Sequence, residues 1–278
     1  MTKMFPAAPT LAPAGAGRID IEGVEKRFAL GAREMVALGG IDLSIRAGEF
    51  VCLLGPSGCG KSTLLNAIAG FAPPTAGRIS VDGAPVRGPA PDRGMVFQEY
   101  ALFPWMTVAK NVAFGLEIKG MKRDEIEART RTLLDTLSLT EFRDRYPKDL
   151  SGGMRQRVAI ARVLALDPPI LLMDEPFGAL DALTRRTLQD ELLRLWQETA
   201  KTIVFVTHSI EESIYLADRI VVMTYRPGTI KAVVPIALPR PRDTARADFN
   251  DLKRELGGLV MAEQRRHTDD EIKPATFD

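Results

Sequence analysis

The segment with the clearest chemistry is GPSGCGKST, residues 55–63, in which three glycines precede one lysine and two hydroxyl side chains follow it. It satisfies the pattern G-x-x-x-x-G-K-[ST], in which a flexible loop wraps backbone N–H groups around phosphates. Lys61 can reach the terminal phosphate oxygens, and the hydroxyl of Ser62 can bind Mg²⁺. An apolar run precedes the loop and a helical pattern follows it, so the segment predicts a nucleotide-phosphate site.

Two carboxylates, Asp174 and Glu175, end the apolar run ILLMDE, residues 170–175. A carboxylate at the end of a buried strand is costly to leave unpaired, and Mg²⁺ nearby would compensate its charge. We expect Asp174 to hold Mg²⁺ through water and Glu175 to polarise the attacking water. Taken alone, the pair leaves open the alternative that both acids cap the following helix.

Gln98 and His208 each follow an apolar run, GMVF (94–97) and IVFVT (203–207). The carboxyl ends of parallel strands form the edge at which ligands bind in such sheets. At that edge Gln98 would offer an amide oxygen to Mg²⁺ or to water. A lone histidine at a strand end is often structural, and the position of His208 at this edge is what favours a catalytic role.

A second candidate for phosphate binding is LSGGMRQRVAIARVLAL, residues 150–166. Ser151, Gly152 and Gly153 stand before a helix-forming run, and bare N–H groups at a helix start favour an anion. Val158, Ala161 and Ala165 lie on one face of that predicted helix. The chain therefore contains two separate segments that could hold phosphate.

Short apolar runs predict the sheet that would position these residues. Runs of this kind suit strands covered on both faces, as in a parallel sheet with crossover helices. The runs are FVCLL (50–54), GMVF (94–97), ILLM (170–173), IVFV (203–206) and RIVVM (219–223). By contrast, Ile41, Leu43 and Ile45 alternate with polar residues, as in a half-buried strand.

Helical patterns fill most of the remaining chain. Between Glu99 and Asp167 the strand signal disappears, and residues 122–139 have helical spacing, so we expect a helical insertion in an α/β core. Residues 181–200 form a further amphipathic pattern. After Asp243 the chain is polar and charged, with no room for a second folded domain.

Charge, apolar run length and cysteine content limit the classes of protein to which the chain can belong. The 278 residues carry 37 basic and 36 acidic side chains, so no chain-wide positive field points to nucleic acid or to an anionic membrane. No apolar run approaches the ~20 residues that span a bilayer. The first 17 residues are rich in Pro, Ala and Gly, which predicts a disordered tail. Two cysteines, Cys52 and Cys59, indicate neither a zinc site nor a disulfide framework, as in a cytosolic protein.

Taken in order, these motifs resemble the nucleotide-binding subunit of an ABC transporter over about residues 18–240. The series is GPSGCGKST, Gln98, LSGGMRQR, ILLMDE, ALD (179–181) and His208. LSGGMRQR is the discriminating motif, because many unrelated NTPases have the phosphate loop alone. The resemblance implies an α/β fold: a P-loop NTPase (RecA-like) core, an antiparallel β subdomain and an inserted α-helical subdomain.

The implied domain organisation has three parts. Residues 18–243 would form the ABC ATPase domain, with the helical subdomain inserted at about residues 99–167. An N-terminal tail, residues 1–17, and a C-terminal tail, residues 244–278, would flank it.

The resemblance also implies a role for each matching residue toward ATP and Mg²⁺. Gln98 would sense the γ-phosphate, Glu175 would be the catalytic carboxylate and His208 would hold the γ-phosphate. Phe28 would stack on adenine, although a half-buried strand aromatic fits it equally well. The other residues expected to bind the nucleotide are Gly55, Pro56, Ser57, Gly58, Cys59, Gly60, Lys61, Ser62, Thr63, Ser151, Gly152, Gly153 and Asp181, and the Mg²⁺ ligands are Ser62, Gln98 and Asp174.

Two phosphate segments in one chain then imply two chains in the active unit. In a head-to-tail homodimer, Ser151, Gly152 and Gly153 would face the ATP held by Lys61 of the partner subunit. Asp181 would help to join the two subunits.

Further segments look like the nitrate, sulfonate and taurine import branch. These are residues 99–117, 208–223, RPGTI (226–230) and LPRPRD (238–243). That branch implies two permease subunits, a soluble substrate-binding protein and a peripheral place on the cytoplasmic face of the membrane, with no nucleic-acid partner. Ser209 departs from the family, which usually has Asp there.

Two alternative functions remain. An exporter subunit shares all of the motifs and is the nearer alternative. An ABC ATPase that acts on DNA is disfavoured, because such proteins usually carry a long coiled coil and no sustained heptad run occurs.

Cys59 lies inside the phosphate loop, two residues before Lys61. Positive surroundings at a helix start predict a lowered thiol pKa and a reactive cysteine that MgATP would protect from alkylation. The alternative is that Cys59 is only a small residue that the loop tolerates.

Overall fold

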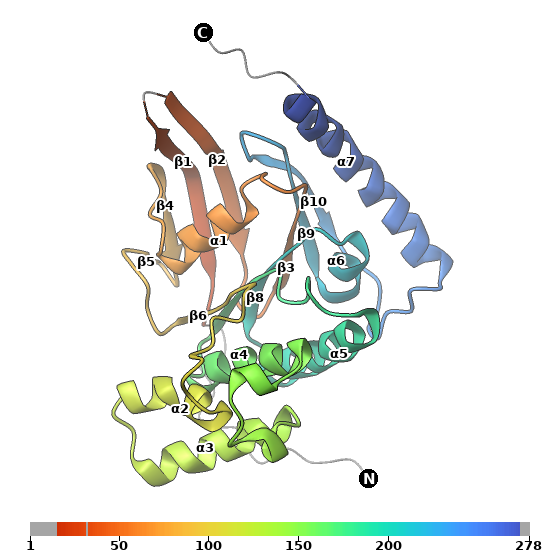
Figure 1. Ribbon diagram of the computed structural model, residues 1–278. Helices are drawn as coiled ribbons and strands as arrows, with labels where there is room; N and C mark the ends of the chain where they lie inside the picture. The colour runs from red at the N-terminus through yellow and green to blue at the C-terminus, as the bar shows by residue number, and fades with distance from the viewer. Residues whose placement is uncertain (1–15, 32, 273–278) are drawn as a thin grey trace.

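The computed structural model describes residues 16–31 and 33–272, arranged as two β-sheets with helices around them (Figure 1). The N-terminal tail expected over residues 1–17 lies outside the described residues, apart from Ala16 and Gly17. No helix within the described ranges combines the length and hydropathy needed to cross a bilayer.

The larger sheet has six strands in the order β10-β9-β3-β8-β7-β6. Its strands are β3 (Phe50–Leu54), β6 (Arg93–Val96), β7 (Ile170–Asp174), β8 (Thr202–Thr207), β9 (Arg219–Met223) and β10 (Ile230–Pro235). All neighbours pair in parallel except β10 with β9. Every residue of β3 and β8 is buried, as expected for strands covered on both faces.

The smaller sheet is antiparallel, in the order β2-β1-β4-β5. Its strands are β1 (Ile19–Leu30), β2 (Arg33–Ile45), β4 (Ala76–Val81) and β5 (Ala84–Pro85). Ile41, Leu43 and Ile45 of β2 are buried, as their alternation predicts. They share a hydrophobic cluster with α1 (Lys61–Ala69), which ties this sheet to the phosphate loop.

Helices occupy the segment between β6 and β7, at the bottom of Figure 1. They are α2 (Val108–Ile118), α3 (Arg123–Thr136), two 3₁₀ turns (Thr140–Phe142 and Pro147–Asp149) and α4 (Gly152–Ala165). Val158, Ala161 and Ala165 of α4 are buried in the same cluster as the apolar face of α2. The middle and the end of α4 are thereby packed against the helical subdomain.

After β7 the chain forms α5 (Ala182–Thr199), α6 (Ile210–Leu216) and α7 (Ala247–Ile272). The sequence analysis expected only a polar, charged tail after Asp243, but residues Ala247–Ile272 form helix α7. Phe249 and Leu256 of α7 are buried in the main core, and the helix lies beside α6 along one edge of the molecule (Figure 1). Its apolar residues recur at helical spacing, but the many charges between them lower the average hydropathy and hide the pattern.

Candidate functional site

The phosphate loop connects β3 to α1 and has a defined conformation. Gly58 and Gly60 have φ angles of 73° and 95°, in the left-handed region that favours glycine. A Cβ at Gly60 would also lie 2.8 Å from Leu38 Cδ2, so a side chain has no space there. The Lys61 Nζ donates to the carbonyls of Gly55 (2.9 Å) and Pro56 (2.8 Å). The lysine thus holds its own loop in a curved shape.

Ser62, the second residue of α1, contacts the end of β7. Its Oγ donates to Asp174 Oδ1 at 2.9 Å. Burial raises the pKa of Asp174 and adjacent Glu175 adds to the rise, whereas the Ser62 hydrogen bond opposes it. A cation at this point would favour the charged carboxylate.

The hydroxyl of Ser62 and the carboxylate of Asp174 are hard oxygen donors beside a phosphate loop, which suits Mg²⁺. Among the described residues no group of three or more His, Cys, Asp or Glu side chains could hold a metal by itself. The donor set therefore fits an Mg²⁺ ion that takes its other ligands from phosphate and water.

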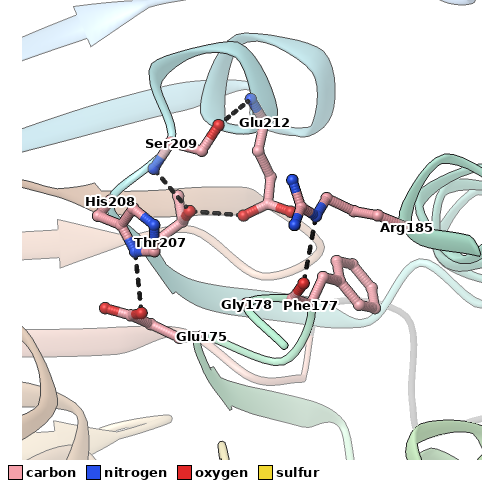
Figure 2. A pocket seen from close by; sticks show the side chains of 8 residues that line it. All are labelled: Glu175, Phe177, Gly178, Arg185, Thr207, His208, Ser209 and Glu212. Carbon is pink, nitrogen blue, oxygen red and sulfur yellow. Dashed lines mark hydrogen bonds and ion pairs between the residues drawn. The ribbon is translucent and has the colours of Figure 1, made fainter. Parts of the chain in front are cut away.

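Glu175 and His208 meet at the ends of β7 and β8. His208 Nδ1 lies 2.9 Å from Glu175 Oε2, the contact drawn in Figure 2. Glu175 has a φ of 42°, unusual for a residue with a side chain, and its N–H donates to Val206 O at 3.0 Å. The carboxylate is consequently held beside the histidine by the backbone of the adjacent strand.

A buried network stands behind His208 (Figure 2). Glu212 Oε1 accepts from Gln189 Nε2 at 2.9 Å, and its Oε2 accepts from the Thr207 hydroxyl. The same Thr207 oxygen accepts the Ser209 N–H at 3.0 Å. Burial raises the pKa of Glu212. This network fixes the backbone on both sides of His208, and no motif in the sequence indicated it.

Ser209, the departure from the family pattern, is the N-cap of α6. Its Oγ accepts from the Glu212 N–H at 3.3 Å. Serine is a favoured N-cap residue, as aspartate is. The hydrogen-bonding role expected of an aspartate at this position is therefore retained without its charge.

One cleft of about 390 Å³ is lined by nine of the eighteen predicted site residues, whereas Asp174 and His208 are not among its lining residues. Its lining residues are Phe28, Met35, Ala37, Ser57, Gly58, Gly60, Lys61, Ser62, Thr63, Gln98, Glu175 and Arg226. Phe28 is 37% exposed, and its aromatic ring is available on this wall rather than packed in the core. Met35, Ala37 and Arg226 were not identified from the sequence.

The residues Ser151, Gly152, Gly153 and Asp181 are not among the described residues that line this cleft. Ser151 is exposed and is the N-cap of α4, where its Oγ accepts from Met154 N at 3.3 Å. Asp181 is the N-cap of α5, and the backbone N–H of Thr184 holds its pKa below the ordinary value. These two helix starts form a second polar surface, separate from the lining of the cleft.

The prediction of a lowered Cys59 pKa is wrong. The thiol is buried, and burial raises its pKa more than nearby Lys61 lowers it. A Cβ at Gly55 would lie 2.9 Å from Cys59 Sγ, so the sulfur fills the inside of the loop. The alternative interpretation, a small residue that suits the loop, agrees with this packing.

The chain is similar to a known protein family, to curated relatives and to solved structures. The family model described as "ABC transporter" matches residues 38–178, about half of the chain. The chain belongs to the ABC transporter family. The match runs from β2 to just beyond Glu175 and so includes the phosphate loop, Gln98 and the LSGGM segment.

Two curated relatives and one solved structure extend the match beyond the family model. The nitrate import ATP-binding protein NrtD of Synechocystis is 48% identical, over 85% of this chain and 89% of that protein. The taurine import ATP-binding protein TauB of Ruegeria pomeroyi is 47% identical, over 86% and 89%. A dimeric ATP-binding cassette bound to ADP and Pi superposes with a TM-score of 0.72 at 35% identity, over 80% of this chain and all of that one.

These similarities confirm the fold class and the family predicted from the motifs, including the likeness to nitrate and taurine import proteins. The protein is an ABC-type ATPase with the fold of an ATP-binding cassette. The geometry above assigns this ATPase a cleft, two strand-end carboxylates and a histidine, all within one chain.

Proposed function

We propose that this ABC ATPase is the ATP-hydrolysing subunit of an importer for a small solute of the nitrate, sulfonate or taurine type. The observation that carries the proposal is the gathering of Lys61, Gln98 and Glu175 on one cleft while Ser151–Gly153 lie on another surface. Identity of 47–48% to nitrate and taurine import proteins supports the solute class.

Each predicted residue at or beside the cleft has a chemical role in this proposal. The N–H groups of residues 58–62 and Lys61 Nζ bind the phosphate oxygens, for which Lys61 leaves the carbonyls of Gly55 and Pro56. Phe28 stacks on adenine. Glu175 accepts a hydrogen bond from the attacking water, and His208, held by that carboxylate at 2.9 Å, binds the γ-phosphate.

Ser62, Asp174 and Gln98 would hold Mg²⁺, which neutralises charge on the phosphates when bound. The hydrogen bond between Ser62 and Asp174 already sets their oxygens on the same side of the loop. Gln98 lines the same cleft from the end of β6.

The active unit in this proposal is a head-to-tail dimer. Exposed Ser151, half-buried Gly152 and buried Gly153 form a helix start, which favours an anion, yet they do not line their own chain's cleft. ATP bound by one chain would satisfy them in the other chain. Asp181, exposed at the start of α5, would join the subunits at the same contact. The dimeric state of the similar cassette supports this arrangement.

A segment after Gln98 would pass nucleotide-driven movement to the permeases. The Tyr100 hydroxyl lies 3.2 Å from the position that a Cβ on Gly152 would take, so this segment touches the LSGGM loop. Trp105, five residues later, is 70% exposed and makes a tilted ring contact with Phe103, with ring centroids 5.6 Å apart. The segment thus connects the cleft, the dimer surface and an exposed aromatic suited to a membrane partner. The ATPase would then sit on the cytoplasmic face of the membrane, bound through its permeases.

The test is reconstitution of the chain with its two permease subunits in lipid vesicles. A soluble binding protein should stimulate ATP hydrolysis when loaded with one member of a panel of nitrate, taurine and an alkanesulfonate. Stimulation without any binding protein, together with solute movement out of the ATP-containing compartment, would instead identify an exporter. Stimulation by DNA would contradict a transport function.

A further inference from the structure

Arg226 lines the proposed nucleotide cleft, although the sequence analysis gave the RPGTI segment (226–230) no role in nucleotide binding. It belongs to the turn between β9 and β10, and its Nε donates to the carbonyl of Gly58 in the phosphate loop at 3.4 Å. Lys61 and Arg226 are the two cations among the described residues that line the cleft. The second cation comes from a segment distant in sequence from the loop.

The turn that carries Arg226 is fixed against both neighbouring walls of the cleft. Gly228 donates to Ala37 O and accepts from Gly39 N, each at 3.0 Å, which joins the turn to β2. A Cβ on Gly228 would lie 2.2 Å from Cys59 O, so the turn packs directly on the backbone of the phosphate loop. Only glycine permits this approach. The position of Arg226 is therefore determined by β2 and by the loop itself.

Helix α7 fixes the residue before Arg226. The Tyr225 N–H donates to Glu263 Oε2 at 3.0 Å, and Lys231 Nζ donates to Glu263 Oε1 at 2.7 Å. The Tyr225 ring makes an edge contact with His267, with ring centroids 4.8 Å apart. The Arg226 guanidinium carbon lies 5.6 Å from the centroid of the same Tyr225 ring. The C-terminal helix thus supports the turn from behind.

We propose that Arg226 is a phosphate-binding residue of the nucleotide site, positioned by Glu263 of α7. The inference rests on the proposed binding of ATP in this cleft. Nε of Arg226 is directed to Gly58, which leaves its two terminal NH₂ groups to form a fork on phosphate oxygens. Lys61 supplies a point charge at the bottom of the loop, and Arg226 supplies a second charge from its outer rim.

The experiment measures dissociation constants of ATP, ADP and adenosine in Mg²⁺-free buffer, where hydrolysis is absent. Four proteins are compared: the unchanged chain, Arg226→Gln, Arg226→Lys and a control, Arg131→Gln, on the exposed face of α3. Loss of one exposed charge-assisted contact should weaken ATP and ADP binding about tenfold in Arg226→Gln and leave adenosine binding unchanged. Arg226→Lys should recover part of the loss, and the control should bind as the unchanged chain does.

Several outcomes would overturn the assignment. Equal weakening of adenosine and ATP would make Arg226 a base-stacking residue, and unchanged ATP affinity in Arg226→Gln would remove it from the site. A Lys61→Ala variant separates this inference from the proposed function. If that variant binds ATP normally, the cleft is not the nucleotide site; if only Arg226→Gln binds normally, the inference alone fails.

The contribution of Glu263 is tested by a double-mutant cycle with Glu263→Ala and Arg226→Gln. Glu263→Ala should weaken ATP binding about threefold in the unchanged chain and have no further effect when Arg226 is already replaced. A merely structural role for Glu263 would lower ATP affinity equally in both backgrounds. That additive result would remove the positioning role of α7.

Discussion

The phosphate-loop cleft and the start of α4 are both candidate phosphate-binding surfaces, but they differ in how many side chains they bring together. At the cleft, side chains that follow β3, β6 and β7 converge, and hydrogen bonds link Ser62 to Asp174 and Glu175 to His208, which lines a neighbouring pocket. At the start of α4, Ser151 caps its own helix and faces solvent. In the proposed function, the first surface would bind a nucleotide alone, whereas the second would act only when another molecule brings phosphate to it.

This difference explains why one chain would have two phosphate-binding segments. In the proposed function, the cleft would supply binding and the reactive carboxylate, and the α4 start would supply the contact through which a second chain detects the bound nucleotide. Variants can therefore separate chemistry, which belongs to the cleft, from assembly, which belongs to α4.

The largest difference between loss of ATP hydrolysis and loss of ATP binding is expected from Glu175→Gln. Removal of the carboxylate that polarises water should slow hydrolysis roughly 10²–10⁴-fold, or about 3–5 kcal/mol of barrier, while ATP still binds. Phosphate release should be measured, and size-exclusion chromatography should show a dimer trapped by ATP. Glu198→Gln, on the exposed side of α5, is the control; near-normal turnover in Glu175→Gln would contradict the catalytic assignment.

The converse variant is Ser151→Arg, which places a bulky cation at the start of α4. It should abolish the ATP-dependent dimer and reduce turnover to the level of an isolated chain, about 10²-fold or more, because the partner's contact is removed. Binding of ATP by the monomer should stay within about twofold, since Ser151 does not line its own cleft. The matched control is Thr132→Arg on α3, and a large loss of monomer affinity in Ser151→Arg would mean that the two surfaces are not separate.

A smaller, pH-dependent effect is expected from Glu212→Gln, behind His208. Burial raises the pKa of Glu212 above its unfolded value, so its stabilising contribution is fully present below the unfolded pKa, near 4.5, and is lost as pH rises through the folded pKa. The amide variant lacks this titration. Its free energy of unfolding relative to the unchanged chain should therefore improve as pH rises from 4 to 8. Urea unfolding at several pH values measures the free energy of unfolding of both proteins. If the difference between them is independent of pH, the buried-carboxyl interpretation is contradicted.

The smallest effect concerns Cys59. Because the thiol is buried and its pKa is raised, iodoacetamide should label it at least about tenfold more slowly than an unfolded-chain cysteine. MgATP should change the labelling rate by less than about twofold, as the burial already exists within the loop. Mass spectrometry of the labelled peptide tests this, and rapid labelling that MgATP prevents would restore the original expectation of a reactive residue.

Much of this site could be predicted from the sequence because its residues lie next to strong local patterns. The phosphate loop follows an unbroken apolar strand, and Asp174, Glu175 and His208 each follow another. In a parallel sheet, position along a strand is enough to bring such residues to one edge. The same apolar runs therefore predicted both the strands and the site residues that follow them.

The residues that were missed depend on contacts between segments distant in sequence. Arg226 reaches the cleft because Gly228 packs on the phosphate loop, and Glu212, held by Gln189, supports His208 through Thr207 and Ser209. Helix α7 was missed because its apolar residues are interspersed with charges. Cys59 was misjudged because a sequence reveals the neighbouring lysine but not how deeply the sulfur is buried.

The strand order has a consequence for how the protein is made. Strand β8 is inserted between β3 and β7, so the two strands that precede Lys61 and Glu175 are separated by one synthesised later. A nascent chain that has left the ribosome only as far as β7 cannot yet close the sheet. The nucleotide cleft should thus mature only after Thr207 emerges, and until then the apolar edges of β3 and β7 are surfaces for chaperones to cover.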